Sequence, residues 1–315
     1  MCCHDDHEAL PWLAACLLTP HLPPVISLAV SLSQLRSRAW KAVKPVMARR
    51  LFSQTPGRNS LIQVFQESGV RSITLADTRT RNSLSLQMLR ELQEAVGEED
   101  PSLRCIILQA QGKVFSGGHN LKELTGREGK SHHQTVFNEC THLMLTLQRL
   151  PVPVVAKVNG VAAAAGCQLV SSCDIAIASQ GSSFSTPGAN VGIFCSTPGI
   201  PLVRCVPRKV SAHMLLTGLP ITAEEALQAG LVSKVVPEEE LDCEVQKVVD
   251  TILHKSRSVI ALGKKFMYKQ MEMGIEDAYR EGGNLMVHNI NMIDGQEGIN
   301  SFIRKCSPSW THSDN

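Results

Sequence analysis

Acidic residues are missing from two long stretches of the chain, and paired cysteine motifs are missing throughout. No Asp or Glu occurs between Glu8 and Glu67 or between Asp174 and Glu224. The 11 cysteines form no CxxC pair and follow no repeating spacing, which argues against a disulfide framework and against a structural zinc site. The chain is therefore expected to work in a reducing compartment and without a bound metal.

The net charge of the chain is also small. The 31 Lys and Arg residues nearly balance the 29 Asp and Glu residues, leaving a formal charge of +2. A chain with so little excess charge is a poor partner for a polyanion, so nucleic acid is not expected as a ligand. The 315 residues are 43% hydrophobic, which is enough to fill a substantial core and predicts a globular protein.

The first 60 residues are predicted to be a separate segment. Beyond Glu8 it contains basic residues but no acidic ones, and serine and alanine fill much of the rest. A basic, acid-free and potentially amphipathic leader is typical of a mitochondrial transit peptide, and residues 47–54 fit this pattern best. We expect residues 1–60 to be a transit peptide or disordered leader, which places the mature protein in the mitochondrial matrix. Because the segment is long, Met47 is an alternative start site.

The competing interpretation of this segment is a secretory signal or membrane anchor over residues 10–30. Acidic residues precede that stretch, where such signals carry positive charge, and Pro20, Pro23 and Pro24 interrupt it. A membrane-spanning helix needs about 20 consecutive apolar residues. Stable membrane insertion is therefore not expected.

From residue 61 onward, strand-like and helix-like patterns alternate. Strands are predicted where short apolar runs are bounded by turn residues, and helices where apolar residues recur every three or four positions. The expected strands are 61–65, 72–76, 104–109, 154–158 and 174–178, and the expected helices are 84–96, 136–150, 223–228, 238–254 and 259–282. This alternation predicts an α/β core with largely parallel strands over residues 61–207, followed by a helical subdomain over residues 208–315.

Two loops rich in glycine and alanine follow successive strands of this core, at residues 112–120 and 159–168. Paired glycines let a ligand approach the backbone, and the N–H groups that begin the next helix favour negative charge. The first loop is not a P-loop, because the Ser or Thr after Lys113 and the upstream glycine are absent. The second could instead reflect tight packing of a helix on the sheet. Together the loops could direct two backbone N–H groups at one carbonyl oxygen, which would make an oxyanion hole.

At these loops the chain resembles the crotonase, or enoyl-CoA hydratase/isomerase, superfamily. The matching motifs occur in the family's order: TRNSL (80–84), GKVFSGG (112–118), VVAKVNG (154–160), GCQL (166–169), CDI (173–175), LTG (216–218), AEEA (223–226), GLVS (230–233) and DGQEG (294–298) with Phe302. The runs PGANVG (187–192) and FCSTP (194–198) resemble one subgroup most. The resemblance implies a ClpP/crotonase-like fold, which is a spiral of strand–strand–helix units. It also implies a C-terminal helical subdomain that assembles homotrimers or dimers of trimers.

The resemblance further implies a coenzyme A thioester as ligand, with no other cofactor. The backbone N–H groups of His119 and Ala165 would form the oxyanion hole for the thioester carbonyl, although Ala165 replaces a usual glycine. Contacts to coenzyme A would fall in the first loop, at Ser116, Gly117, Gly118, Asn120, Leu121 and Lys122. Lys264 and Lys265 are available for the phosphates of coenzyme A, or are simply solvated at the surface.

Both catalytic carboxylates of the family's hydratases are absent from this chain. The two glutamate positions match Gln168 and Gly188, and neither an amide nor a hydrogen atom can exchange protons with a substrate. General acid–base groups typically contribute about 10²–10⁴ each to a rate, so efficient hydration is not expected. A slip in alignment does not restore the second carboxylate, because Asp174 and Glu224 are the nearest acids.

Three other side chains near the motifs could supply chemistry. His119 titrates in a suitable range, but its family role is through its backbone. Cys195 follows Gly188 closely, yet a lone cysteine without a base is weak evidence for a nucleophile. Asp174 matches a family position at the start of a strand, where a structural hydrogen-bonding role is expected.

Three hypotheses follow for the function. The leading one is an acyl-CoA-binding mitochondrial protein of fatty-acid and lipid metabolism that lacks efficient hydratase activity. The second is an active enzyme that handles a different acyl-CoA thioester with the same oxyanion hole, so the sequence leaves open whether the chain is an enzyme. The third is a non-catalytic partner of active crotonases.

Overall fold

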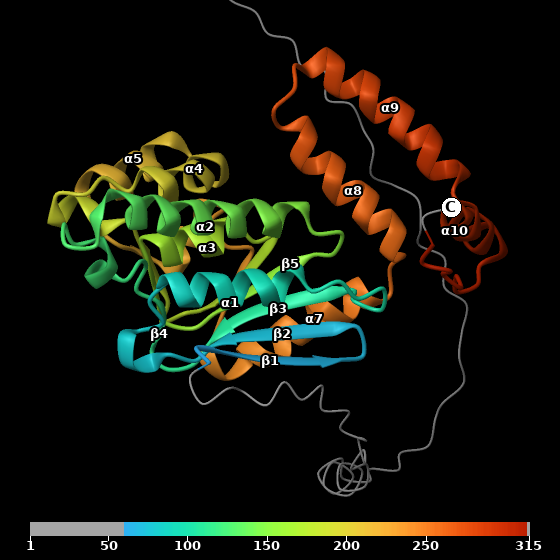
Figure 1. Ribbon diagram of the computed structural model, residues 1–315. Coiled ribbons are helices and arrows are strands. Elements are labelled where there is room, and N and C mark those ends of the chain that lie inside the picture. The colour runs from blue at the N-terminus through green and yellow to red at the C-terminus, as the bar shows by residue number, and fades with distance from the viewer. Residues whose placement is uncertain (1–59, 314–315) are drawn as a thin grey trace, which may run out of the picture. The chain divides into compact units, whose positions relative to one another are not determined.

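The computed structural model describes residues 60–313 (Figure 1). Apart from Ser60, the predicted leader lies outside the described residues, and so does the alternative start at Met47. Within the described range, no helix combines the length and the apolar character needed to cross a bilayer.

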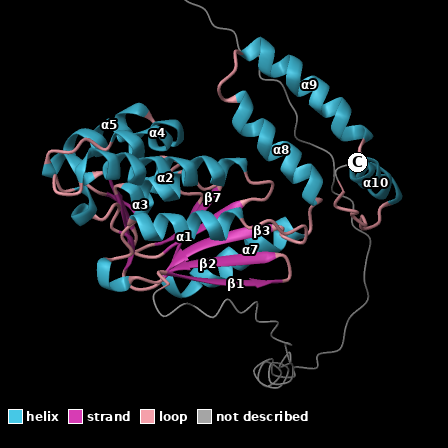
Figure 2. Ribbon diagram, in the orientation of Figure 1, coloured by secondary structure: helices cyan, strands magenta, loops and turns pink. Residues whose placement is uncertain are grey.

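A six-stranded sheet forms the centre of the fold, with the strand order β1-β2-β3-β5-β7-β10 (Figure 2). The first two strands make an antiparallel hairpin, and the other neighbouring pairs are parallel. The turn at Ser68 and Gly69 has φ angles of 51° and 81°, which is the left-handed conformation that tight hairpins require. The strands are β1 (Ile62–Glu67), β2 (Val70–Leu75), β3 (Cys105–Ala110), β5 (Val154–Val158), β7 (Ile175–Ser179) and β10 (Lys234–Val236).

A second sheet of four very short strands, β4-β6-β8-β9, was not expected from the sequence. Its strands are β4 (Val114–Ser116), β6 (Val161–Ala163), β8 (Ser183–Ser185) and β9 (Ile221–Thr222). Each of β4, β6 and β8 follows directly on a longer strand of the larger sheet, and a helix comes next in the chain. The predicted crotonase-like spiral of strand–strand–helix units is therefore confirmed.

The central strands of the larger sheet are buried on both faces, as β3 illustrates. Ile106 and Leu108 pack in the main core with helices α1 (Leu86–Gly97) and α2 (Gly129–Arg149), whereas Cys105 and Ile107 pack against α7 (Leu241–Leu253). Successive side chains of a strand point to opposite faces, and an unbroken apolar run is typical of a parallel strand covered on both sides. Each buried side chain of this kind stabilises the fold by about 1.5–3 kcal/mol.

The remaining helices lie between the later strands or after them. They are α3 (Ala165–Ser171), α4 (Ser196–Cys205), α5 (Arg208–Thr217), α6 (Ala223–Gln228), α8 (Arg257–Gln270), α9 (Ile275–Asn291) and α10 (Ile293–Arg304). The single helix predicted over residues 259–282 is wrong: α8 ends at Gln270, and α9 begins after Gly274, which serves as its N-cap. The boundary after residue 207 stays a prediction, although β9 and β10 lie beyond it and complete the two sheets.

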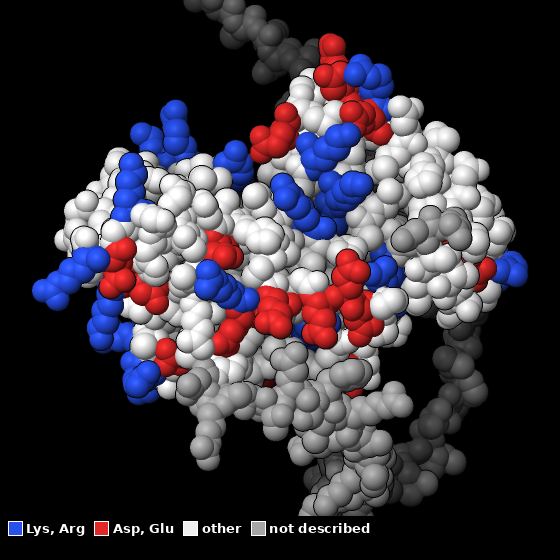
Figure 3. Space-filling model, viewed as in Figure 1, with Lys and Arg blue, Asp and Glu red and all other residues white. Residues whose placement is uncertain are grey.

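The face shown in Figure 3 carries both signs of charge. Acidic side chains gather in a band at the level of α1, whose exposed positions include Glu94, and basic side chains lie above the band. This mixture agrees with the small net charge of the chain.

Candidate functional site

The first glycine loop is held in place by the segment that precedes α1. The buried Asn82 donates from its side-chain amide to the carbonyls of Gln111 (2.9 Å) and Val114 (2.8 Å). Ser116 Oγ donates in turn to the Asn82 carbonyl at 2.8 Å. Asn82 has a φ of 52°, a conformation that asparagine tolerates better than most residues. The TRNSL motif thus holds β4 and the following loop in place through these hydrogen bonds.

Gly118 is the point at which the two loops meet. Its φ is 87°, and its carbonyl accepts a hydrogen bond from the Leu84 N–H at 2.8 Å. A Cβ at this position would lie 2.8 Å from the Ala164 Cβ and 3.1 Å from the Ala165 nitrogen. Only glycine therefore lets the loop after β4 contact the start of α3 so closely.

The second loop turns sharply just before α3. The Ala164 N–H donates to the Ser185 carbonyl at 2.9 Å, and Ala164 has φ 48° and ψ −117°. This conformation costs a non-glycine residue on the order of 1–3 kcal/mol. Two residues further on, a Cβ at Gly166 would overlap the Ser116 carbonyl. The N-terminus of α3 therefore lies in close contact with the end of β4. The strained backbone at Ala164 and the absence of a side chain at Gly166 permit this contact.

The two backbone N–H groups named by the family resemblance lie on either side of this contact. His119 follows Gly118 directly, and Ala165 is the first residue of α3. Within residues 60–313, neither N–H donates to another group of the protein. Ala165 is fully buried and has a negative φ, so its methyl group is accommodated without backbone strain. The arrangement leaves two donors free at one point of contact between the loops.

The His119 side chain points away from this pair of N–H groups. Its Nδ1 lies 3.2 Å from the Leu84 carbonyl oxygen, and its ring meets Phe137 of α2 edge-on, with centroids 5.1 Å apart. Burial lowers the pKa of His119, so the imidazole is neutral at physiological pH. A general-acid role would require the charged form, which this environment disfavours.

Gln168 stands at the first of the two positions where the resemblance implies a catalytic glutamate. Its N–H donates to the Ala164 carbonyl at 3.0 Å, so it lies one turn after the sharp loop, and only 4% of its surface is exposed. Among the described residues, the side-chain Oε1 has no hydrogen-bond partner, and neither has the hydroxyl of the fully buried Thr186, just before Pro187. Thr186 was missed by sequence reasoning, because a lone threonine between a strand and a proline carries no distinctive signal.

Gly188 stands at the second position implied by the resemblance, and the fold leaves no room there for any side chain. A Cβ at Gly188 would overlap the Ile193 carbonyl and would lie 2.7 Å from the Cys195 sulfur. The loop is closed by a hydrogen bond from the Ile193 N–H to the Gly188 carbonyl at 2.9 Å. The missing carboxylate therefore cannot be restored by substitution alone, since the backbone would have to move first.

Cys195 is a poor nucleophile in this setting. The side chain is buried, and burial raises the pKa of its thiol, an effect that a hydrogen bond from the Gly188 backbone only partly offsets. No charged side chain contributes to the shift. Because the thiolate is the reactive form, the thiol is inert at neutral pH.

The predicted coenzyme A contacts after Gly118 lie on the surface. Asn120 caps the short 3₁₀ helix Leu121–Leu124 by accepting from the Lys122 N–H at 3.2 Å. Glu123 Oε2 accepts from the Leu86 N–H at 2.8 Å, which ties this helix to the start of α1. Lys122 makes no ion pair within residues 60–313, so its ammonium group is available to an anionic ligand.

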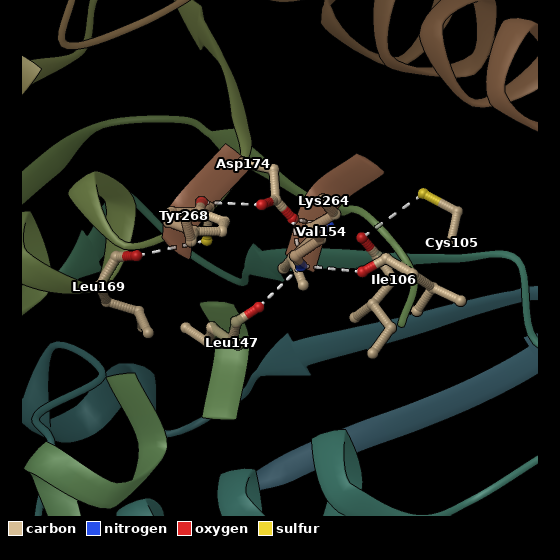
Figure 4. A network of polar contacts seen from close by, with 10 residues as sticks. Cys105, Ile106, Leu147, Val154, Leu169, Asp174, Lys264 and Tyr268 are labelled. Carbon is tan, nitrogen blue, oxygen red and sulfur yellow. Dashed lines mark hydrogen bonds and ion pairs between the residues drawn. The ribbon is translucent and has the colours of Figure 1, made fainter. Parts of the chain in front are cut away.

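The suggestion that Lys264 contacts coenzyme A phosphates is wrong. Figure 4 shows its ammonium group buried against Asp174, at 2.6 Å from Oδ2, where it also donates to the carbonyls of Leu147 (2.8 Å) and Val152 (2.9 Å). Tyr268 donates to the other Asp174 oxygen at 2.8 Å. The network fastens α8 to the core, and Asp174 has the structural role expected of it. Lys265, by contrast, is exposed.

The spiral of paired strands, with two free N–H groups where successive loops meet, defines the class of protein. The chain belongs to the enoyl-CoA hydratase/isomerase family, whose model matches residues 66–313. Among curated relatives, enoyl-CoA hydratase domain-containing protein 3, mitochondrial, is 57% identical in Xenopus laevis, over 79% of this chain and 85% of the relative. The human protein of that name is 52% identical, over 78% and 82% of the two chains.

Solved structures agree with this assignment. The crystal structure of human enoyl coenzyme A hydratase domain-containing protein 3 has a TM-score of 0.79 and 50% identity, covering 80% of this chain and all (100%) of its own. An enoyl-CoA hydratase from Mycobacterium smegmatis has a TM-score of 0.78 and 42% identity, covering 80% and 99%. The subgroup resemblance noted for residues 187–198 is confirmed.

Proposed function

We propose that the chain is a mitochondrial protein that binds acyl-CoA thioesters without hydrating them efficiently. The observation that supports the proposal is the contact of Gly118 with the start of α3, because His119 follows Gly118 directly and Ala165 begins that helix, and both N–H groups are without a partner in residues 60–313. A thioester carbonyl is a single acceptor atom, and two converging backbone donors suit it. The predicted mitochondrial location is confirmed by the names of relatives that are 46–57% identical.

The proposed site can polarise a carbonyl but has no group to move a proton. The amide of Gln168 can hold a ligand or a water by hydrogen bonds, and the buried Thr186 hydroxyl offers a further donor and acceptor. At the second position, Gly188 provides nothing. With both acid–base groups gone, each worth about 10²–10⁴ in rate, binding without efficient turnover is the expected behaviour. A role in fatty-acid and lipid metabolism is part of the proposal.

Self-association through the C-terminal helices also belongs to this proposal. Large apolar side chains are exposed along α9 and α10, including Ile275 (71%), Tyr279 (78%), Phe302 (85%) and Ile303 (70%). Contiguous apolar surface of this kind marks an interaction face. It supports a homotrimer or a dimer of trimers as the working assembly, which sedimentation velocity would test.

The alternative of an active enzyme using Cys195 or His119 receives no support from their surroundings. Cys195 is held as a thiol, and the His119 imidazole is neutral and directed at Leu84. The alternative of a non-catalytic partner of active crotonases requires no ligand at all. A binding experiment separates it from the leading proposal.

The decisive measurement is titration calorimetry of the purified protein with crotonyl-CoA, with longer enoyl-CoA esters and with free coenzyme A. We expect the thioesters to bind more tightly than coenzyme A, and spectrophotometry to detect no hydration at ordinary hydratase rates. A Gly118→Ala variant should lose this preference, because its Cβ crowds the Ala165 nitrogen. Gly126→Ala is the matched control, since nothing lies within 4 Å of its added methyl group. Efficient turnover would contradict the proposal, and failure to bind any thioester would favour the partner hypothesis.

A further inference from the structure

The His119 side chain connects the first glycine loop to two different helices. Its Nδ1 contacts the Leu84 carbonyl oxygen at 3.2 Å, just before α1, and its ring rests edge-on against Phe137 of α2 at an interplanar angle of 72°. We propose that this imidazole is a positioning group, which holds the loop so that the N–H of the same residue stays directed at the thioester oxygen. The part of this inference that concerns the ligand rests on the proposed function.

The direction of the hydrogen bond follows from its partner. A backbone carbonyl can only accept, so the Nδ1 atom must carry the proton. Because burial lowers the pKa of His119, the ring is neutral and its Nε2 is a bare acceptor. That Nε2 atom is buried and has no partner among the described residues. The polar contribution of the side chain therefore acts through Nδ1 alone.

Leu84 is a suitable anchor because both of its backbone groups bond to the loop. Its N–H donates to the Gly118 carbonyl at 2.8 Å, and its carbonyl accepts from the next residue of the loop, His119. The Leu84 side chain is completely buried. Ser85 follows and caps α1 by accepting from the Met88 N–H at 3.2 Å. The anchor is thus fixed on one side by the core and on the other by a helix.

Loss of the imidazole would remove the hydrogen bond between the His119 side chain and the Leu84 carbonyl. Backbone pairing with Leu84, which includes the hydrogen bond to the Gly118 carbonyl, would then be the remaining restraint on residue 119, and the neighbouring glycine is the residue whose backbone is least restrained by its own side chain. The N–H of residue 119 would sample directions away from the Ala165 N–H. The affinity for the thioester carbonyl would fall, whereas contacts to the rest of coenzyme A would not change.

Two substitutions at residue 119 separate positioning from mere filling of space. His119→Asn keeps a nitrogen donor at the δ position, which can reach the Leu84 carbonyl, but loses the ring. His119→Leu fills a similar volume and has no donor. If the ring only fills space, the leucine variant should behave better than the asparagine variant. If the hydrogen bond positions the loop, the order should be reversed.

The first readout is amide hydrogen exchange in the ligand-free, full-length protein. The Leu84 N–H should exchange about tenfold faster in His119→Leu, as expected when a buried hydrogen bond is lost, and at nearly the wild-type rate in His119→Asn. The Leu108 N–H, in the middle of β3, serves as the internal reference for global opening. Equal exchange at Leu84 in both variants, or acceleration of Leu84 and Leu108 alike in His119→Leu, would overturn the inference.

The second readout is the preference for crotonyl-CoA over coenzyme A, together with the carbonyl stretching frequency of the bound thioester. His119→Leu should lose about tenfold of this preference, with a smaller shift of the carbonyl band, and His119→Asn should retain both. A wild-type protein with no preference for the thioester would refute the proposed function, while Leu84 exchange would still decide the role of His119. Unchanged preference and carbonyl band in His119→Leu would refute positioning.

Discussion

Replacing Lys264 by methionine should destabilise the protein severely, because the ammonium group uses all three of its donors inside the core. It bonds to Asp174 and to the carbonyls of Leu147 and Val152, and the Lys264 and Asp174 side chains are only 5% and 9% exposed. Methionine fills much of the same volume but leaves a buried carboxylate without its cation. Breaking a buried ion pair from one side costs about 3–5 kcal/mol, a large part of the 5–15 kcal/mol that holds a typical domain together. Denaturation in urea, followed by circular dichroism, would measure the loss.

The neighbouring lysine provides the matched control. Lys265→Met changes an exposed residue on the same helix and should alter the free energy of unfolding by less than about 0.5 kcal/mol. Adding Asp174→Asn to Lys264→Met should cost less than the two single changes summed, because the unpaired charge is removed as well. If Lys264→Met proves as mild as Lys265→Met, the network in Figure 4 does not fasten α8 to the core.

Three further predictions follow from the site. Gly188→Ala should destabilise the protein by about 1–3 kcal/mol, as overpacking does. For the same reason, Gln168→Glu combined with Gly188→Glu should not create hydratase activity. Measurable hydration of crotonyl-CoA by this double variant would show that the loop can open. Burial lowers the pKa of His119 in the folded state, so on acidification the imidazole is protonated first in the unfolded chain. Stability should therefore fall as the pH drops below about 6.5. A melting temperature that is flat from pH 7.5 to 5.5 would contradict this. Iodoacetamide should label the exposed Cys243 well before the buried Cys195, and mass spectrometry showing the reverse order would restore Cys195 as a nucleophile.

Much of the fold could be predicted from local patterns. The strands near β1, β2, β3, β5 and β7 and the helix α6 were expected within a few residues, because apolar periodicity and turn residues mark their limits. The second sheet was not expected, since strands of two or three residues are too short to show a period. The break between α8 and α9 was missed because an apolar pattern can continue past a glycine such as Gly274.

Charge and side-chain direction were the least predictable features. Lys264 follows the usual pattern of an exposed lysine on an amphipathic helix, and only its neighbours Asp174, Leu147 and Val152 make it a buried residue. Likewise, the sequence places a histidine after two glycines but does not say that its ring turns toward Leu84 and Phe137. These outcomes depend on contacts between segments far apart in the chain, which no local pattern encodes.

The sequence by itself determined the family, the order of the motifs and the lack of any Asp or Glu between Asp174 and Glu224, because these depend only on which residues occur and in what succession. Only the tertiary structure decided that Gly118 touches the start of α3, since parallel strands bring the ends of separate segments together. Only the structure, too, showed that Gly188 has no space for a side chain, because the atoms that fill it belong to Ile193 and Cys195. The missing second carboxylate is therefore a property of the loop's packing as well as of one residue.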